Sequence, residues 1–348
     1  MKKIDIYIFK NLLIGFVTSF LITTMVMLIG NTIKVYDFLF AKGVSLGLMA
    51  KIFGDMVAFL SIFTIPMSLM LSINFLYTEL SSRSEITALR SSGISLVRIF
   101  YPAFLFTIVI FAILFYDTSF LAYKAKLDYK INLAGALKNR VYMGLKQKKF
   151  YTGIKDATMY ANDLSSSKRS LYNVFYAKGN SAIIAKEAHF KDAQMGIIVN
   201  FKKAEIYNKS GNNIEYGHVN NYELAILFGE NKPHIGKYNT RYMTMTELID
   251  YYKTQKNLTA LYKINKMLVF SLSVFVLSII GFSLGITFSR SGKSAGAIIS
   301  ISIFFIFYIL QMLGESLFKS HSLIWPIWLP DLILFLFGAY LFYKKSTN

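Results

Sequence analysis

The sequence predicts a membrane α-helical bundle of six transmembrane helices with an inserted all-β, jelly-roll-like domain. Six long apolar runs are arranged as three before and three after a polar block that covers residues 117–266. The loops that join these runs on one side of the membrane are rich in lysine and arginine, and this charge bias gives the bundle a direction.

Each apolar run is long enough, or nearly so, to cross a bilayer as a helix. A hydrocarbon core of about 30 Å requires roughly 20 helical residues, and backbone polar groups in lipid must be satisfied within the segment. Only the last run carries a charge, Asp331. The runs cover residues 11–33, 56–78, 99–116, 267–289, 294–314 and 320–343.

The charges of the short loops predict that both termini are cytoplasmic. With six helices, the two termini share one side with the second-to-third and fourth-to-fifth loops, and all four segments are net positive. Cytoplasmic loops carry such an excess of lysine and arginine. The block 117–266 then lies outside, in the periplasm where the cell has one.

The polar block begins as a helix and changes to strands near Phe150. Short segments rich in β-branched and aromatic residues alternate with turn signals, which is typical of an antiparallel sandwich or jelly roll. Helical periodicity returns over 244–261 and leads into the fourth membrane helix. The predicted strands begin at Lys149, Ser170, Ser181, Gly196 and Ile214, with turn signals at 179–181, 191–192 and 210–213.

The polar block is strongly basic. It holds 24 Lys and Arg against 12 Asp and Glu, a net charge of +12 out of +19 for the chain. A basic exported domain favours an anionic partner. Nucleic acid is not expected on that side of the membrane, so an anionic lipid or phosphorylated glycolipid is the better candidate. A lysine-rich proteome with a solvated basic surface explains the charge equally well.

The sequence carries no pattern of a catalytic or metal site. The absence of cysteine excludes disulfides, thiolate metal sites and cysteine nucleophiles. The four histidines are scattered, without metal-ligand spacing. Gly292-Lys293-Ser294 resembles the end of a phosphate-binding loop, but Thr287 stands where that motif requires glycine. We therefore expect no catalytic residue, cofactor or metal, and any ATP hydrolysis on a separate chain.

The loop at 79–98 predicts a short amphipathic helix near residues 82–92. Ser82 with Glu85 three positions later matches a capping box. Ile86 and Leu89 share one face, and Gly93 can end the helix in a left-handed conformation. In one interpretation this helix rests on the bilayer surface. In the other it is a coupling helix that docks into a groove of a cytoplasmic motor.

Three segments resemble the lipopolysaccharide-export permeases of the LptF/LptG family. They are Pro66 with Leu76-Tyr77 and SEITALRSSGIS at 84–95, then SRSGKSAG at 289–296 leading to Phe307-Tyr308, and finally WLPD at 328–331. With the arrangement of helices and block, the resemblance covers essentially the whole chain. One departure is visible: many members have Glu and Arg directly before the fourth helix, where this chain has YKINK at 262–266. We carry no family role over to that segment.

The resemblance implies a permease subunit of an ATP-binding-cassette transporter. Such a transporter extracts lipopolysaccharide from the inner membrane and passes it to a periplasmic bridge. The implied partners are a cytoplasmic ATPase dimer, a second homologous permease in a heterodimer, and a bridge protein with a single membrane anchor. Helices one and five would line the lipid cavity.

The resemblance also implies site residues. Those expected to contact the ATPase are Glu85, Ile86, Leu89 and Arg90. Lys34 and Lys42, near the outer end of the first helix, are candidates for contact with lipid phosphate, because a lysine ammonium serves phosphate as a point charge. The simpler interpretations are a snorkelling Lys34 and a solvated Lys42.

These observations predict three parts in a multi-pass protein of the bacterial inner membrane. Residues 1–117 form helices one to three with the coupling helix, 118–260 form the periplasmic β-domain with helical flanks, and 261–348 form helices four to six. The alternative function is a membrane-anchored envelope scaffold. Its basic exported β-domain would bind anionic glycopolymer or lipid without a motor.

Overall fold

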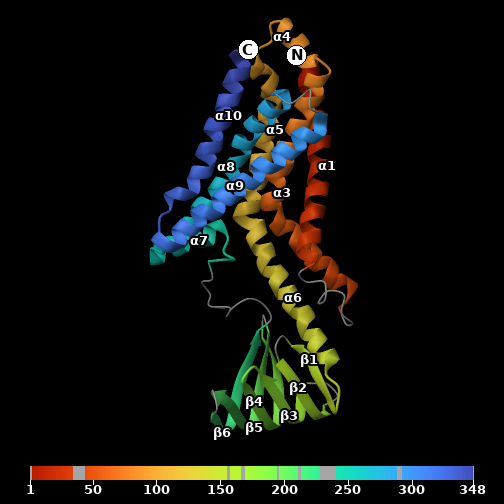
Figure 1. Ribbon diagram of the computed structural model, residues 1–348, viewed down its shortest axis with the longest axis vertical. Helices are drawn as coiled ribbons and strands as arrows, with labels where there is room; N and C mark the ends of the chain where they lie inside the picture. Colours follow the sequence, from red (N-terminus) through yellow and green to blue (C-terminus); the bar gives the residue numbers. More distant parts are fainter. Residues whose placement is uncertain are drawn as a thin grey trace. The chain divides into compact units, whose positions relative to one another are not determined.

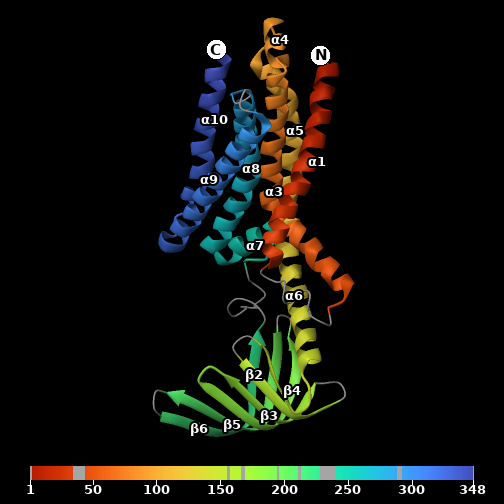
Figure 2. The same ribbon diagram turned by 45° about the vertical axis from the view of Figure 1, so that its right-hand side comes forward.

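The computed structural model describes residues 2–33, 44–154, 157–165, 169–193, 196–210, 213–227, 240–287 and 292–347. The chain forms two compact units. The helical unit comprises Met1–Gly30, Met56–Lys126 and Gly236–Asn348, and the β unit comprises Asn31–Asp55 and Leu127–Ile235. Figures 1 and 2 show the elements of both units.

Six helices are long and apolar enough to cross a membrane, which confirms the predicted number. They are α1 (Lys2–Ile33), α3 (Leu46–Ser82), α5 (Leu96–Tyr116), α8 (Leu258–Thr287), α9 (Gly292–His321) and α10 (Leu329–Thr347). Most of these helices are longer than the apolar runs that predicted them. Polar residues at the ends of a run can continue the same helix beyond the bilayer into water. Both termini lie at one end of the helical unit (Figure 1).

Helix α8 is the centre of the helical unit, and two glycines allow it to approach α3 closely. A Cβ atom on Gly281 would lie 2.8 Å from the carbonyl oxygen of Met70, and one on Gly285 would lie 2.8 Å from that of Asn74. Gly281 and Gly285 are four residues apart, the spacing that lets membrane helices pack backbone against backbone. The Asn74 side-chain amide donates to the carbonyl of Gly281 at 3.5 Å.

Helix α5 does not end at the polar block. A π-helical turn, η1 (Asp117–Leu121), carries it into α6 (Ala122–Gly144), as the helical start of the block predicted. The buried Asp117 carboxylate accepts a hydrogen bond from the Ser61 hydroxyl at 2.6 Å. At the next residue, the hydroxyls of Thr118 and Ser271 are 2.9 Å apart. These contacts join the π-turn to α3 and α8.

Two short elements complete the end of the helical unit that lies opposite the termini. Helix α7 (Met245–Gln255) begins with a capping box, in which the Thr244 hydroxyl accepts from the Glu247 amide and the Glu247 carboxylate accepts from the Thr244 amide. A 3-10 turn, η3 (Trp325–Trp328), precedes α10. Figure 1 shows α7 beside the start of α8.

The β unit contains a six-stranded antiparallel sheet whose strands follow sequence order. The all-β insert is thus confirmed. Its described connections are those of a meander, where a jelly roll would have Greek-key crossings. The strands are β1 (Lys149–Ile154), β2 (Ala157–Leu164), β3 (Ser170–Lys178), β4 (Ser181–Ala193), β5 (Gly196–Ser210) and β6 (Asn213–Leu227). Figure 2 shows the sheet curving across these strands.

Two of the three predicted turns exist. Lys178 pairs with Ser181 across Gly179, which has a φ of 57°, and Ser210 pairs with Asn213. The turn predicted at 191–192 is wrong, because β4 runs through both residues in register with β5. Strand β2 was not predicted.

One face of the sheet forms the core of the β unit. Alternate residues of the central strands are buried on it, among them Met159, Val174, Ile183 and Phe201. Val141 and Leu145, at the end of α6 and just after it, pack into the same cluster. The last turns of α6 therefore cover the sheet.

Candidate functional site

A short helix, α4 (Glu85–Ser91), connects α3 to α5 and forms the first candidate site. Its start is set by Ser84, which adopts a left-handed conformation with a φ of 59°. The long helix α3 ends just before this break, at Ser82, and the chain continues as α4 in a new direction. The predicted capping box is wrong: the Ser82 hydroxyl donates to the carbonyl of Glu79, and Ser84 makes no side-chain cap.

The end of α4 is a complete Schellman motif, the arrangement of two backbone hydrogen bonds that closes many helices. The amide of Gly93 donates to the carbonyl of Arg90, and the amide of Ile94 donates to that of Leu89. Gly93 has a φ of 82°, as the sequence predicted. Ser95 then caps α5, because its hydroxyl accepts from the amide of Arg98 at 3.3 Å.

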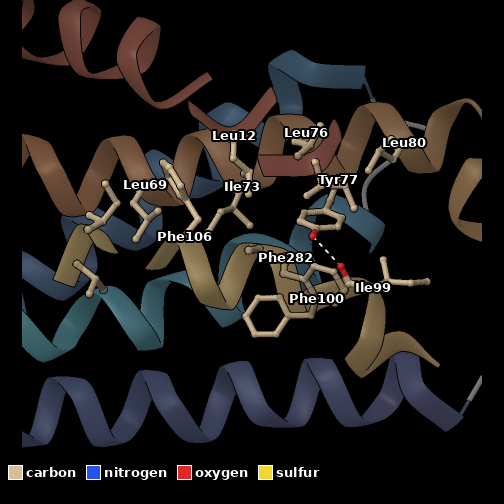
Figure 3. Close-up of a cluster of buried hydrophobic side chains, with 14 of the residues drawn as sticks. Leu12, Leu69, Ile73, Leu76, Tyr77, Leu80, Ile99, Phe100, Phe106 and Phe282 are labelled. Carbon is tan, nitrogen blue, oxygen red and sulfur yellow. Dashed lines mark hydrogen bonds between the residues drawn. The ribbon is translucent and has the colours of Figure 1, made fainter. Parts of the chain in front are cut away.

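The inner face of α4 is anchored in the core of the helical unit. Ile86 is 3% exposed and belongs to the large cluster beneath the helix, and Leu89 is half-buried against it. Figure 3 shows this cluster around Tyr77, whose hydroxyl donates to the carbonyl of Ile99 at 2.9 Å. The Tyr77 and Phe282 rings meet edge to face, with centroids 4.5 Å apart. Elements α3, α4, α5 and α8 thus form one packed assembly.

The outer face of α4 is polar and open to solvent. The Glu85 carboxylate forms no hydrogen bond or ion pair with any residue that the structure describes, whereas Glu79 and Arg83 form an ion pair of 2.6 Å just before it. Thr87, Ala88 and Arg90 are exposed. The face therefore presents an uncommitted carboxylate beside small and cationic side chains.

Arg90 has a contact that the sequence did not reveal. Its guanidinium donates to the backbone carbonyl of Lys345 in α10, at 3.4 Å. On the other side of the site, Arg98 forms an ion pair with Asp5 of α1 at 2.6 Å. The α4 region therefore touches both ends of the chain. Contacts between residues so far apart in sequence leave no local pattern to detect.

The predicted site residues are thus distributed unevenly. Glu85 and Arg90 lie on the outer side of α4, while Ile86 is committed to the core of the chain itself. The Ile86 side chain packs within the chain itself and Leu89 does so in part, and their contact with a groove on the ATPase stays a prediction. Lys34 and Lys42 lie outside the described residues.

The second candidate site is a concave region on the face of the sheet opposite the core. It has a volume of about 870 Å³ and is lined by Tyr160, Asn173, Val174, Phe175, Ile184, Ala185, Lys186, Lys203, Glu205, His218, Val219 and Asn220. The mixture of aromatic, aliphatic and cationic groups suits an amphiphilic anion. No group of three or more metal-ligating side chains occurs in the described part of the chain.

Comparison with known proteins gives the chain its family. No individual curated protein matches it. The family model described as "Lipopolysaccharide export system permease LptF/LptG" matches residues 6–344. Permeases of this family are transmembrane subunits without catalytic activity, and the ATPase is the separate subunit LptB. The chain therefore belongs to the LptF/LptG family and is a permease of the ABC transporter that exports lipopolysaccharide.

Proposed function

We propose that α4 is the surface through which this permease binds its ATPase, with Glu85 and Arg90 as the contact residues. The observation that carries the proposal is the Glu85 carboxylate, which is left without a hydrogen bond or ion pair among the described residues. A charge so placed is available to a partner and can fix the position at which the two proteins dock.

The packing beneath α4 supports a mechanical role. A coupling element must transmit a displacement, and a flexible loop would absorb it. Here Ile86 is buried in the core, and the Schellman motif closes the helix. The hydrogen bond from Tyr77 joins the C-terminal end of α3 to α5. A force on α4 is therefore passed to α3, α5 and, through Phe282, to α8.

Arg90 connects α4 to α10 as well, because its guanidinium donates a hydrogen bond to the carbonyl of Lys345. We infer that ATPase closure moves α4 together with the last turn of α10. The exposed Arg90 guanidinium has further donors for a carboxylate on the ATPase.

The test is co-purification of the ATPase with a Glu85→Lys variant from mild detergent. The expected result is loss of the ATPase, because the reversed charge meets the same groups on the partner that Glu85 is proposed to contact. The matched control is Glu223→Lys, the same change on β6 of the β unit, which is expected to retain the ATPase. Recovery of a normal amount of ATPase with the Glu85→Lys variant would contradict the coupling role.

The remaining family features extend the proposal. The end that carries α4 and both termini is cytoplasmic, and a second homologous permease pairs with this one in the inner membrane. We infer that the β unit passes lipopolysaccharide to a periplasmic bridge protein with a single membrane anchor. Among the described strands, β1 and β6 each pair on one side only, which leaves edges for a further strand. Lys34 and Lys42 remain the proposed contacts for lipid phosphate.

A further inference from the structure

The start of α10 buries a carboxyl group that has no partner. Asp331 is 9% exposed, and neither of its oxygens forms a hydrogen bond with the residues that the structure describes. Among those residues the helical unit buries one other carboxyl group, Asp117, and it accepts from the Ser61 hydroxyl. An ionised carboxylate that is buried without a partner is costly, and inside a membrane protein it indicates a functional site.

The Asp331 side chain lies on the inner face of α10. Leu334 and Gly338 share this face and are buried, whereas Leu332 and Ile333 on the other side are exposed. The Cα–Cβ bonds of a helix tilt toward its N-terminus. The carboxyl group of Asp331 is therefore directed back toward η3, around which α9 and α10 meet (Figure 1).

The side chain of Gln311 in α9 is held at η3. Its amide nitrogen donates to the carbonyl of Ile327 at 3.3 Å. Pro330, three residues after Ile327, has no amide hydrogen to offer that carbonyl, as a 3-10 turn otherwise would. Gly314 permits the close approach of α9, because a Cβ atom there would lie 3.2 Å from the Cα of Ile327. Asp331 follows Ile327 by about one helical turn, which brings its carboxyl group near the Gln311 amide.

The Gln311 amide oxygen is a second group without a partner. Gln311 is 3% exposed, and its Oε1 has no hydrogen bond with the described part of the chain. Reversing the amide would turn its oxygen toward the Ile327 carbonyl, and both groups are acceptors. The backbone supplies no donor at Leu329, whose amide donates to the carbonyl of Pro326. The site thus contains unpartnered acceptor oxygens of Asp331 and Gln311.

We propose that Asp331 binds a proton at neutral pH and that the resulting hydroxyl donates to the Gln311 amide oxygen. The proton removes the buried charge and gives both side chains a hydrogen bond, so two unfavourable groups are satisfied at once. The bond joins α10 to α9. Loss of the proton would leave a buried charge between these helices and weaken their contact. The proposal goes beyond ATPase coupling and does not depend on it.

Infrared spectroscopy can detect this proton, because the C=O stretch of a protonated carboxyl group is separate from the amide and carboxylate bands. The full-length chain is measured in neutral detergent at neutral pH. We expect an acid band that is lost in Asp331→Asn. The matched control, Asp250→Asn, changes an exposed aspartate of α7 and should keep the band. Gln311→Leu should shift the band to higher frequency, because the acid loses its acceptor.

The stability of the chain should also depend on pH. From about pH 7 to about pH 9 the Tm of the parent should fall, because the folded chain holds a proton that an unfolded aspartate, with an ordinary pKa of about 3.9, has released. Asp331→Asn keeps a donor at every pH, so its Tm should fall less. Other ionisable groups on α8 and α9 near η3 are the same in both proteins, so the difference between the profiles isolates Asp331. They are Tyr262, Lys263, Lys266, Glu315, Lys319 and His321.

The same measurements can overturn the proposal. Identical acid bands in the parent and in Asp331→Asn would show that Asp331 is ionised. If the Tm of the parent then rises with sodium chloride but not with choline chloride, the site binds a metal cation in place of a proton. An acid band unchanged by Gln311→Leu would exclude Gln311 as the acceptor. Should Gln311→Leu fail to fold, the acid band and the pH profile of Asp331→Asn still decide whether Asp331 holds the proton.

Discussion

At the scale of single residues, Gly93 determines how α4 ends. Its φ of 82° lies in the left-handed region, and its amide closes the Schellman motif with the carbonyl of Arg90. A residue with a Cβ atom costs about 1–2 kcal/mol in that conformation. We therefore expect Gly93→Ala to lower the Tm in detergent by a few degrees and to reduce ATPase recovery, because α4 loses its defined end.

A control for Gly93→Ala is available in α6. A Cβ atom on Gly135 would meet open space, and Gly135 has no left-handed φ, so Gly135→Ala should leave the Tm unchanged or raise it, with a gain of at most about 1 kcal/mol. A Gly93→Ala protein as stable and as well coupled as Gly135→Ala would show that the left-handed turn is not required.

Two candidate capping boxes show how far the conformation of single residues can be predicted from sequence. Ser82–Glu85 and Thr244–Glu247 have the same spacing of a hydroxyl residue and a glutamate, but a capping box forms only at Thr244. Thr244 adopts the extended conformation that a capping residue needs, whereas Ser82 is still helical at the end of α3. The backbone conformation that decides the outcome depends on tertiary packing. Gly93 was predictable because glycine itself favours the conformation that it adopts.

At the scale of elements, the crossing of α3 and α8 depends on two glycines. A Cβ atom on Gly285 would approach the carbonyl oxygen of Asn74 to 2.8 Å and the amide nitrogen of Thr78 to 3.1 Å. Both neighbours are backbone atoms, which cannot rotate away. Since overpacking of this kind costs about 1–3 kcal/mol, Gly285→Ala should lower the Tm and the yield of monodisperse protein in size-exclusion chromatography.

The control for this crossing is Gly54→Ala in α3. Apart from the helix's own nearby backbone, no atom lies within 4 Å of the Cβ position there, so the added methyl group should not lower the Tm. Equal Tm values for Gly285→Ala and Gly54→Ala would contradict this prediction. They would show that α3 and α8 can move apart without loss of stability.

Elements were predictable wherever one physical signal dominates. The six membrane helices follow from apolar length alone, and the hairpin at Gly179 follows from turn chemistry. Strand β2 was missed because its sequence, ATMYANDL, contains Asn and Asp that resemble a loop. The Lys191-Asp192 pair resembles a turn, but β4 continues through it because β5 supplies hydrogen-bonding partners along its whole length. Pairing with a neighbouring strand overrides local propensity in both cases.

At the scale of the whole chain, the structure distinguishes central helices from peripheral ones, which the apolar runs could not do. In the most apolar part of α8, 78% of residues are buried within the chain, against 22% for α1. The hydropathy of the two segments is equal, at 2.4. The exposed apolar face of α1 must therefore contact lipid or another membrane chain. This agrees with the proposed pairing of two permeases.

The orientation of the chain is the last property to test, and its lack of cysteine makes the test direct. Ser91 on α4 and Ser181 at the start of β4 are both exposed, and one membrane span, Leu96–Gly144, separates them in the sequence. The two positions should therefore lie on opposite sides of the membrane. Ser300, which is 1% exposed, supplies an unreactive control.

In spheroplasts, a membrane-impermeant maleimide should label Ser181→Cys and leave Ser91→Cys unmodified until the membrane is permeabilised. The reason is that the arginines beside Ser91 and the lysines near the C-terminus retain their end of the bundle in the cytoplasm. Ser300→Cys should remain unlabelled in both conditions. Labelling of Ser91→Cys from outside would place α4 away from ATP, and a cytoplasmic ATPase could not then reach the surface on which Glu85 lies.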